Sequence, residues 1–131
     1  MSKINSLVVY DAGALLAAER GDDRIRSFHR RCLLHGGSPC VPAPVLTQAW
    51  RGGGRQVGLS RLLKGCTVLP TDEDLARRAG ALLGLSGTAD AVDAIVVATA
   101  VKLEAMVVTS DPQDLYKIGD ATSVSLKLIV L

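Results

Sequence analysis

Near its amino end the chain runs Leu7-Val8-Val9-Tyr10-Asp11, a short apolar segment closed by a carboxylate. A continuous apolar run of this length predicts a strand buried on both faces, because a half-exposed strand would alternate apolar and polar residues. Met106-Val107-Val108-Thr109 has the same character and is followed by Ser110-Asp111. Strands of this kind are typical of a parallel sheet that is covered by helices on both faces.

The rest of the chain alternates between helices and short strands. Further strands are expected at residues 40–41, 67–69 and 124–131. Helices are expected at residues 12–20, 24–35, 42–50, 55–64, 71–83, 89–103 and 112–118. Thr71 and Asp74 are expected to form a capping box at the start of the fifth of these helices. The alternation predicts one domain spanning residues 1–131, an α/β fold with three α/β/α layers and a mainly parallel sheet.

The composition limits the classes of function. Aromatic residues make up 3% of the chain, too few for a surface on which nucleic-acid bases stack, and the net charge of +2 does not mark a general nucleic-acid binder. Cys32, Cys40 and Cys66 fit no metal-binding spacing and are expected to be reduced and buried. Lys102 and Glu104 close the longest apolar run before it reaches the length of a membrane span, so we expect a soluble, cytoplasmic protein.

Acidic residues fall where a parallel sheet would gather them. Asp11 directly follows one buried strand and Asp111 lies two residues past another, so both would lie at carboxyl ends of strands, where α/β sheets bind ligands. Asp90 and Asp93 are three residues apart in the first turn of an apolar helix and would share one face. Asp114 stands three residues after Asp111 and either joins these acids or is a surface residue.

Carboxylates that converge at one place repel each other and need a counter-ion. Oxygen ligands of this kind suit Mg²⁺ or Mn²⁺, which can activate water for the hydrolysis of phosphodiesters. Taken singly, each acid also has a structural explanation: Asp11 could cap a helix, Asp90 could interact with a helix dipole, and Asp111-Pro112 is a common helix start. Their coincidence at strand ends and on one helix face favours a metal site.

Around these acids the chain resembles PIN-domain ribonucleases, most closely the VapC-type toxins of bacterial toxin–antitoxin pairs. The matching segments are residues 8–12, 88–98 and 107–111, in this order over nearly the whole chain. The resemblance implies a PIN fold, Mg²⁺- or Mn²⁺-dependent RNA cleavage, a homodimer and a cognate antitoxin that blocks the site. It implies catalytic and metal-binding roles for Asp11, Asp93 and Asp111, with Asp90 as a further acid seen in some similar sequences.

One position departs from the family. Where the family usually has a glutamate on the helix after the second strand, this chain has Gln48, which can ligate through its carbonyl oxygen or hold a water but adds no charge. Asp90 is expected to restore the missing charge from the facing helix. The alternative is a catalytically weak or inactive PIN-like domain that binds RNA or a protein partner.

Several further residues are candidates for contact with RNA. Arg51 and Arg55 begin a basic stretch at residues 51–64, which either contacts phosphates or is a solvated helix face. Gln48 and Ser110 complete the predicted substrate contacts, and Ser110 is expected to orient a ligand or a water beside Asp111. Trp50 is expected to pack in the core or at a dimer interface.

Two other α/β classes with acids at strand ends fit less well. A response-regulator receiver would need a phosphorylatable aspartate on its third strand, where this chain has Val68-Leu69-Pro70. A haloacid-dehalogenase-type phosphatase would need an aspartate two residues after Asp11, where this chain has Gly13.

Overall fold

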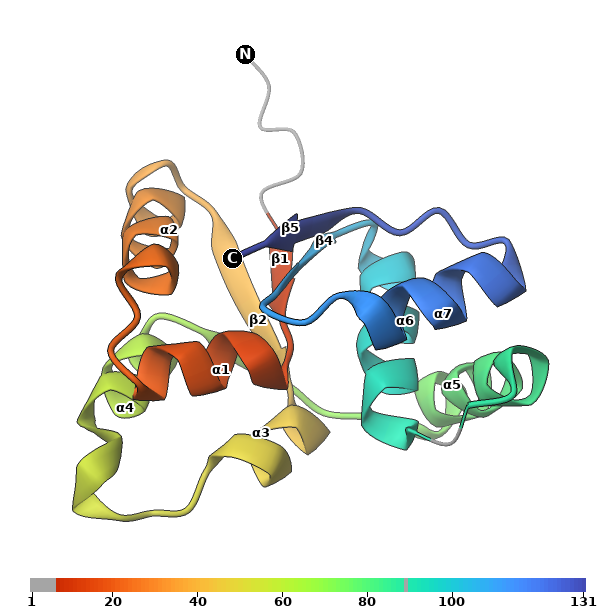
Figure 1. Ribbon diagram of the computed structural model, residues 1–131, viewed down its shortest axis with the longest axis horizontal. Coiled ribbons are helices and arrows are strands. Elements are labelled where there is room, and N and C mark those ends of the chain that lie inside the picture. Colours follow the sequence, from red (N-terminus) through yellow and green to blue (C-terminus); the bar gives the residue numbers. More distant parts are fainter. Residues whose placement is uncertain (1–6, 89) are drawn as a thin grey trace.

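The computed structural model describes residues 7–88 and 90–131 (Figure 1). The strands are β1 (Leu7–Tyr10), β2 (Ser38–Pro42), β3 (Thr67–Leu69), β4 (Met106–Thr109) and β5 (Leu128–Val130). The helices are α1 (Ala12–Glu19), α2 (Asp23–Leu34), α3 (Ala43–Ala49), α4 (Val57–Lys64), α5 (Glu73–Ser86), α6 (Ala91–Leu103) and α7 (Gln113–Thr122), with a short 3-10 helix, η1 (Gly54–Gln56), before α4.

The strands of the described sheet all run parallel, in the order β3-β2-β1-β4-β5. Val9 of the central strand β1 lies opposite Cys40 of β2 on one side and Val107 of β4 on the other. The chain moves outward from β1 through β2 to β3, and then crosses to the other side of β1 to form β4 and β5. The strand order therefore reverses between β1 and β4, which is where α/β folds bind ligands at the carboxyl ends of their strands.

Helices cover both faces of this sheet. α1 packs with α2, α3 and α4, whereas α5, α6 and α7 pack with one another. Figure 1 shows α1, α2 and α4 on one side of the strands and α5, α6 and α7 on the other. The prediction of a three-layer α/β/α domain with a parallel sheet is confirmed.

The core consists mainly of aliphatic side chains from the central strands and α6. Val9 of β1, Val107 of β4, and Val96 and Val97 of α6 are all completely buried, each 0% exposed. Burying one such side chain contributes about 1.5–3 kcal/mol relative to leaving it in water. This packing holds the carboxyl ends of β1 and β4 in place, together with the acids that follow them.

The start of α5 differs from the expectation. Asp72 is the N-cap, and its Oδ1 accepts the backbone N–H of Leu75 at 2.9 Å, whereas Asp74 pairs with Arg78 at 2.9 Å. The predicted capping box of Thr71 and Asp74 is therefore wrong. An aspartate one residue later satisfies the free N–H groups of the first turn, and the next acid is then drawn to the arginine one turn along.

The helices α5 and α7 and the last strand also differ in length from the predicted elements. α5 continues to Ser86 and ends at Gly87, whose φ of 72° is a left-handed conformation that glycine adopts without strain. α7 continues to Thr122, and the last strand is confined to Leu128–Val130 rather than residues 124–131. Within the described residues no single helix is both long and apolar enough to cross a membrane, although α5 and α6 together would be, by length and composition alone.

Candidate active site

Asp11 lies where the strand order reverses. It is the N-cap of α1: its Oδ1 accepts the backbone N–H of Ala14 at 3.0 Å, and only 6% of the residue is exposed. Its own backbone N–H donates to the carbonyl oxygen of Val108 in β4 at 3.3 Å, which ties the ends of β1 and β4 together. Burial raises the pKa of Asp11, and hydrogen bonds from Thr109 and from the N–H groups of Ala14 and Gly13 oppose that rise.

Thr109, the last residue of β4, connects Asp11 with Asp111. The Thr109 side chain is completely buried and hydrogen-bonds to the Asp11 carboxylate. Its Oγ1 also accepts the backbone N–H of Asp111 at 3.0 Å. The charge of the exposed Asp111 adds to the rise in the pKa of Asp11, so the two carboxylates are within electrostatic reach of each other.

Asp93, in the first turn of α6, is the acid most affected by its neighbours. Its side chain is partly buried, and the pKa of Asp93 is raised to about 7 by this burial and then by the charges of Asp90, Asp114 and Asp11. The fold therefore gathers acids from the end of β1, from the start of α6 and from the first turn of α7.

The position of Asp90 is a correction to the expected helix. α6 begins at Ala91 rather than at Ala89, which lies outside the described residues. Asp90 is the N-cap, and its Oδ1 accepts the backbone N–H of Asp93 at 3.0 Å. A carboxylate at this position satisfies a free N–H group and interacts favourably with the helix dipole, so part of its role is structural.

The acidic cluster, namely Asp11, Asp90, Asp93, Asp111 and Asp114, receives no cation from the described protein. Across residues 7–88 and 90–131, the acids that form ion pairs are others: Asp22, Asp23, Glu73 and Asp74. Unpaired carboxylate oxygens are the ligands that Mg²⁺ and Mn²⁺ prefer.

As the described side chains stand, no three acidic, histidine or cysteine groups come together in one ligand set. Mg²⁺ does not require such a set, because it keeps several waters and is usually held by one or two carboxylates. The donor chemistry of the acidic cluster therefore fits a hydrated divalent cation.

Comparison with known families identifies the domain. Residues 8–121 match the PIN domain, a span that contains every acid of the cluster. The chain belongs to the PIN domain family. The family resemblance inferred from the segments around Asp11, Asp93 and Asp111 is thereby confirmed.

Solved structures share the fold of this PIN domain. VapBC2 from Rickettsia felis, bound to a DNA fragment from its promoter, matches with a TM-score of 0.72 and 14% identity over 95% of this chain and 98% of that chain. A toxin–antitoxin complex from Klebsiella pneumoniae matches with a TM-score of 0.64 and 18% identity over 82% and 88%. FitAcB from Neisseria gonorrhoeae matches with a TM-score of 0.66 and 14% identity over 93% and 96%. At these sequence identities, the similarity to solved structures establishes the fold alone. A separate comparison with curated proteins found no match.

Ser110 lies beside Asp11 in this PIN domain. A Cβ atom placed on Gly13 would lie 2.5 Å from Oγ of Ser110 and 3.3 Å from Oδ1 of Asp11. The close approach of the two segments requires glycine at position 13, because any larger residue would displace the serine or the carboxylate. The Ser110 hydroxyl is thus next to an acid of the cluster.

The other residues predicted to contact substrate, Gln48, Arg51 and Arg55, lie in α3 and the segment that follows it. Gln48 is exposed on α3, and Arg55 is exposed in η1. The guanidinium Nη1 of Arg51 donates to the carbonyl oxygens of Thr47 at 3.1 Å and Trp50 at 2.8 Å, so it caps the end of α3. Among the described residues, no hydrogen bond or ion pair joins Gln48, Arg51 or Arg55 to the acidic cluster, although α3 itself packs against α6.

Two polar residues that we did not single out from the sequence have structural roles: Thr109 at the acidic cluster and Gln56 at the end of α3. Thr109 could have been suspected, because it is a polar residue at the end of an apolar strand. Gln56 carried no signal, yet it is only 3% exposed. Its Nε2 donates to the carbonyl of Ala49 at 2.8 Å, and its Oε1 accepts the backbone N–H groups of Arg51 at 2.8 Å and Gly52 at 3.1 Å. It holds the glycine-rich segment against the end of α3.

Proposed function

We propose that this PIN domain is a metal-dependent endoribonuclease and the toxin of a toxin–antitoxin pair. PIN domains are generally nucleases. The observation that carries the proposal is the environment of Asp93, whose pKa of about 7 reflects burial among Asp90, Asp114 and Asp11. Acids crowded in this way repel one another when they are all charged, which raises the free energy of the folded protein. A bound cation removes that cost.

Asp11, Asp93, Asp111 and Asp90 would hold Mg²⁺ or Mn²⁺ in this proposal. When bound, such an ion lowers the pKa of water and neutralises charge on the phosphodiester. Asp114 is near enough to Asp93 to raise the pKa of that carboxyl, and it would accept hydrogen bonds from water at the site.

The residues of the chain orient the carboxylates and set their protonation. Thr109 and the N–H of Ala14 hold the Asp11 carboxylate in one orientation. Asp93 must release its proton before its oxygens can ligate, and a cation in the cluster favours that release. In the hydrolysis itself, a water oxygen attacks phosphorus and one P–O bond to a ribose breaks, which gives a phosphate monoester and a hydroxyl.

The substrate-binding part of the proposal rests on Ser110, Arg55, Arg51 and Gln48. Ser110 has the best support, because its hydroxyl lies beside Asp11. Arg55 is exposed and forms no side-chain hydrogen bond or ion pair with the described residues, so it can bind a phosphate without giving one up. Arg51 would have to give up its two hydrogen bonds at the end of α3, so we expect it to contribute less.

Association with other proteins is a further element of the proposal. The structures from Rickettsia felis and Klebsiella pneumoniae contain toxin–antitoxin complexes, which supports a cognate antitoxin for this chain. We propose that the chain is a homodimer that acts on cytoplasmic RNA until the antitoxin binds. Trp50, which is 44% exposed at the end of α3, is available for such contacts.

A second candidate function is an RNA- or partner-binding domain that cuts weakly or not at all. Gln48 supports it, because this exposed amide adds no charge where the family usually has a glutamate. If Asp90 supplies the missing charge instead, Asp90→Asn should weaken Mn²⁺ binding. Gln48→Glu should then restore it, since the variant returns one negative charge.

The direct test incubates the purified protein with end-labelled single-stranded RNA in Mg²⁺, Mn²⁺ or EDTA. We expect cleavage with either ion and none in EDTA, and a loss of at least about 100-fold in Asp11→Asn and Asp93→Asn, as is common when a catalytic group is removed. Asp120→Asn, which changes an exposed acid of α7 outside the acidic cluster, is the matched control and should cut normally. Cleavage that persists in EDTA would falsify the metal-dependent mechanism, whereas RNA binding without cleavage in Mn²⁺ would favour the second candidate.

A further inference from the structure

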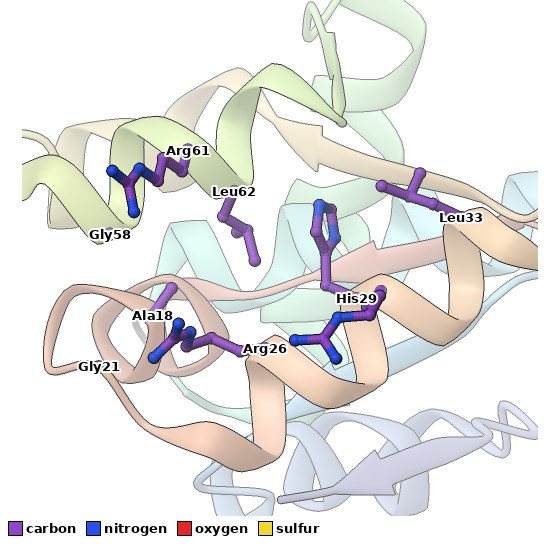
Figure 2. Close-up of a pocket in the computed structure, with 9 residues that line it drawn as sticks. Ala18, Gly21, Arg26, His29, Leu33, Gly58, Arg61 and Leu62 are labelled. Carbon is purple, nitrogen blue, oxygen red and sulfur yellow. The ribbon is translucent and has the colours of Figure 1, made fainter.

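A pocket of about 400 Å³ lies between α1, α2 and α4 (Figure 2). Arginines line it from two helices, Arg26 and Arg30 on α2 and Arg61 on α4. Its volume falls within the range of about 300–1,000 Å³ that is typical of pockets for small organic ligands. None of the residues that line it belongs to the acidic cluster.

The arginines concentrate positive charge that the protein hardly neutralises. Arg26 approaches Asp23 at 3.5 Å, but both side chains are largely exposed, at 57% and 92%, so the pair contributes little. Arg30 and Arg61 form no ion pair or side-chain hydrogen bond with the described residues. Three guanidinium groups that line one pocket offer several N–H donors to an anion, and such charge-assisted hydrogen bonds are stronger than neutral ones.

The floor of the pocket is apolar. Leu62 and Ala18 are buried there, at 4% and 1% exposed, and Figure 2 shows Leu62 pointing from α4 toward α1 and α2, with His29 of α2 beside it. Burial lowers the pKa of His29, which therefore adds no charge at neutral pH. The pocket thus combines an apolar floor with a rim of arginines, which suits a ligand that has both an anionic group and a flat, weakly polar body.

We propose that this pocket binds a nucleotide through a phosphate monoester, with the sugar and base lying over the floor formed by Leu62 and Ala18. Guanidinium groups match phosphate oxygens through paired hydrogen bonds. A phosphate monoester carries a charge of roughly −1.5 to −2 at neutral pH and three acceptor oxygens, so it can engage more than one arginine at once. A carboxylate side chain carries a single charge, which makes an acidic protein segment the poorer fit.

The pocket is separated from the acidic cluster by the length of α1. Asp11 caps the start of this helix, whereas Ala18 and Gly21 line the pocket at its other end. Eight helical residues span about 12 Å at 1.5 Å per residue. A phosphorylated ligand in the pocket would therefore leave the acids free to act on another part of the RNA.

Two sources could supply the phosphate monoester: a free mononucleotide or the phosphorylated end of an RNA. The second deepens the proposed function and rests on it, because hydrolysis at the acidic cluster produces such an end. Binding itself does not depend on cleavage. Measurements in EDTA therefore separate a failure of this inference from a failure of the proposed ribonuclease.

The experiment is calorimetric titration of the purified protein in EDTA with adenosine 5′-monophosphate, with adenosine, and with an RNA octamer that carries either a 5′-phosphate or a 5′-hydroxyl. We expect the monophosphate to bind at least about tenfold more tightly than adenosine, consistent with charge-assisted hydrogen bonds. Arg30→Ala and Arg61→Ala should each weaken it at least about fivefold, and Arg61→Lys should have a smaller effect because it keeps the charge. Arg31→Ala is the matched control, since Arg31 is an exposed arginine of α2 that does not line the pocket.

The outcomes separate cleanly. Tighter binding of the 5′-phosphorylated octamer than of the 5′-hydroxyl octamer supports the inference and identifies an RNA end as the source, and binding of the monophosphate alone supports it with a free nucleotide as the source. Equal binding of adenosine and its monophosphate overturns it, as does an Arg31→Ala loss equal to that of Arg61→Ala. Binding of a glutamate-rich peptide through Arg30 and Arg61, with none of the monophosphate, also overturns it, in favour of a protein ligand. Melting temperatures equal to that of the parent protein show that each variant is folded.

Discussion

The backbone N–H of Asp93 donates to Oδ1 of Asp90 at 3.0 Å, so the residue that caps α6 is also a residue whose charge raises the pKa of Asp93. One carboxylate serves two purposes here. It satisfies a free N–H group of the helix, and it makes its neighbour a weaker acid that a cation can recruit.

These two purposes can be separated by mutation. Asn caps a helix about as well as Asp, so Asp90→Asn should leave α6 intact while it lowers the pKa of Asp93 from about 7 towards its ordinary value of 3.8. Asp90→Ala should lose the cap as well, at a cost of about 1 kcal/mol in the free energy of unfolding. Carbon-detected NMR titration of the Asp93 carboxyl measures the first effect, with Asp72→Asn at the N-cap of α5 as the control. An unchanged titration of Asp93 in Asp90→Asn would show that Asp90 does not act on it through charge.

The stability of the metal-free protein should depend on pH through Asp93. Its pKa is about 7 in the folded protein against an ordinary value of 3.8, so the folded state binds this proton more tightly than the unfolded state. The stabilising contribution is fully present below about 3.8 and is lost as the pH rises through about 7. Between pH 8 and 6.5 the free energy of unfolding should therefore increase as the pH falls.

Urea denaturation in EDTA across that interval measures the effect, and Asp93→Asn should make the curve flatter. The pH interval ends at 6.5 because of His29, whose pKa burial lowers from its ordinary value of 6.5. Below that pH the unfolded state binds a proton at this histidine more readily than the folded state, which favours unfolding. Identical curves for the parent protein and Asp93→Asn would refute the raised pKa.

Gly13→Ala should disturb the acidic cluster through packing alone. Its Cβ would lie 2.5 Å from Oγ of Ser110, so the serine or the Asp11 carboxylate must move, at a cost of about 1–3 kcal/mol in stability. Gly80→Ala is the control, because no atom of the described residues lies within 4 Å of a Cβ at this helical position, its own helix backbone aside, and alanine should stabilise α5 by about 0.5–1 kcal/mol. Thermal melts and Mn²⁺ titrations measure both variants. Equal affinity and stability in Gly13→Ala and the parent would show that the close approach at Ser110 has no consequence.

Gln56→Ala should destabilise the segment after α3. The change removes the donor to the buried carbonyl of Ala49, and a buried group left without a partner costs about 1–3 kcal/mol. It also removes the acceptor of the partly buried N–H groups of Arg51 and Gly52. Gln48→Ala is the matched control, since Gln48 is exposed and should change stability by less than about 0.5 kcal/mol. Chemical denaturation compares the two, and equal effects would contradict the structural role of Gln56.

The sequence by itself was enough for the fold class and for the elements with strong local signals. The short apolar runs at β1 and β4 predicted buried strands, and their alternation with helices predicted a mainly parallel sheet, as the structure has it. The same local reasoning placed Asp11 and Asp111 at strand ends. It failed at the start of α5, where we predicted a capping box of Thr71 and Asp74, whereas the structure has Asp72 as the N-cap.

Only the tertiary structure decided which of these groups act on one another. Asp11 is 82 residues from Asp93 in the chain, yet its charge helps to raise the pKa of Asp93, because α6 packs against β1. The roles of Thr109 and Gln56 also depend on contacts between distant segments, because Thr109 hydrogen-bonds to Asp11 and Nε2 of Gln56 donates to Oε2 of Glu19 at 2.5 Å. Local patterns report on short-range propensity and burial, whereas the order β3-β2-β1-β4-β5 sets the long-range distances on which electrostatics depends.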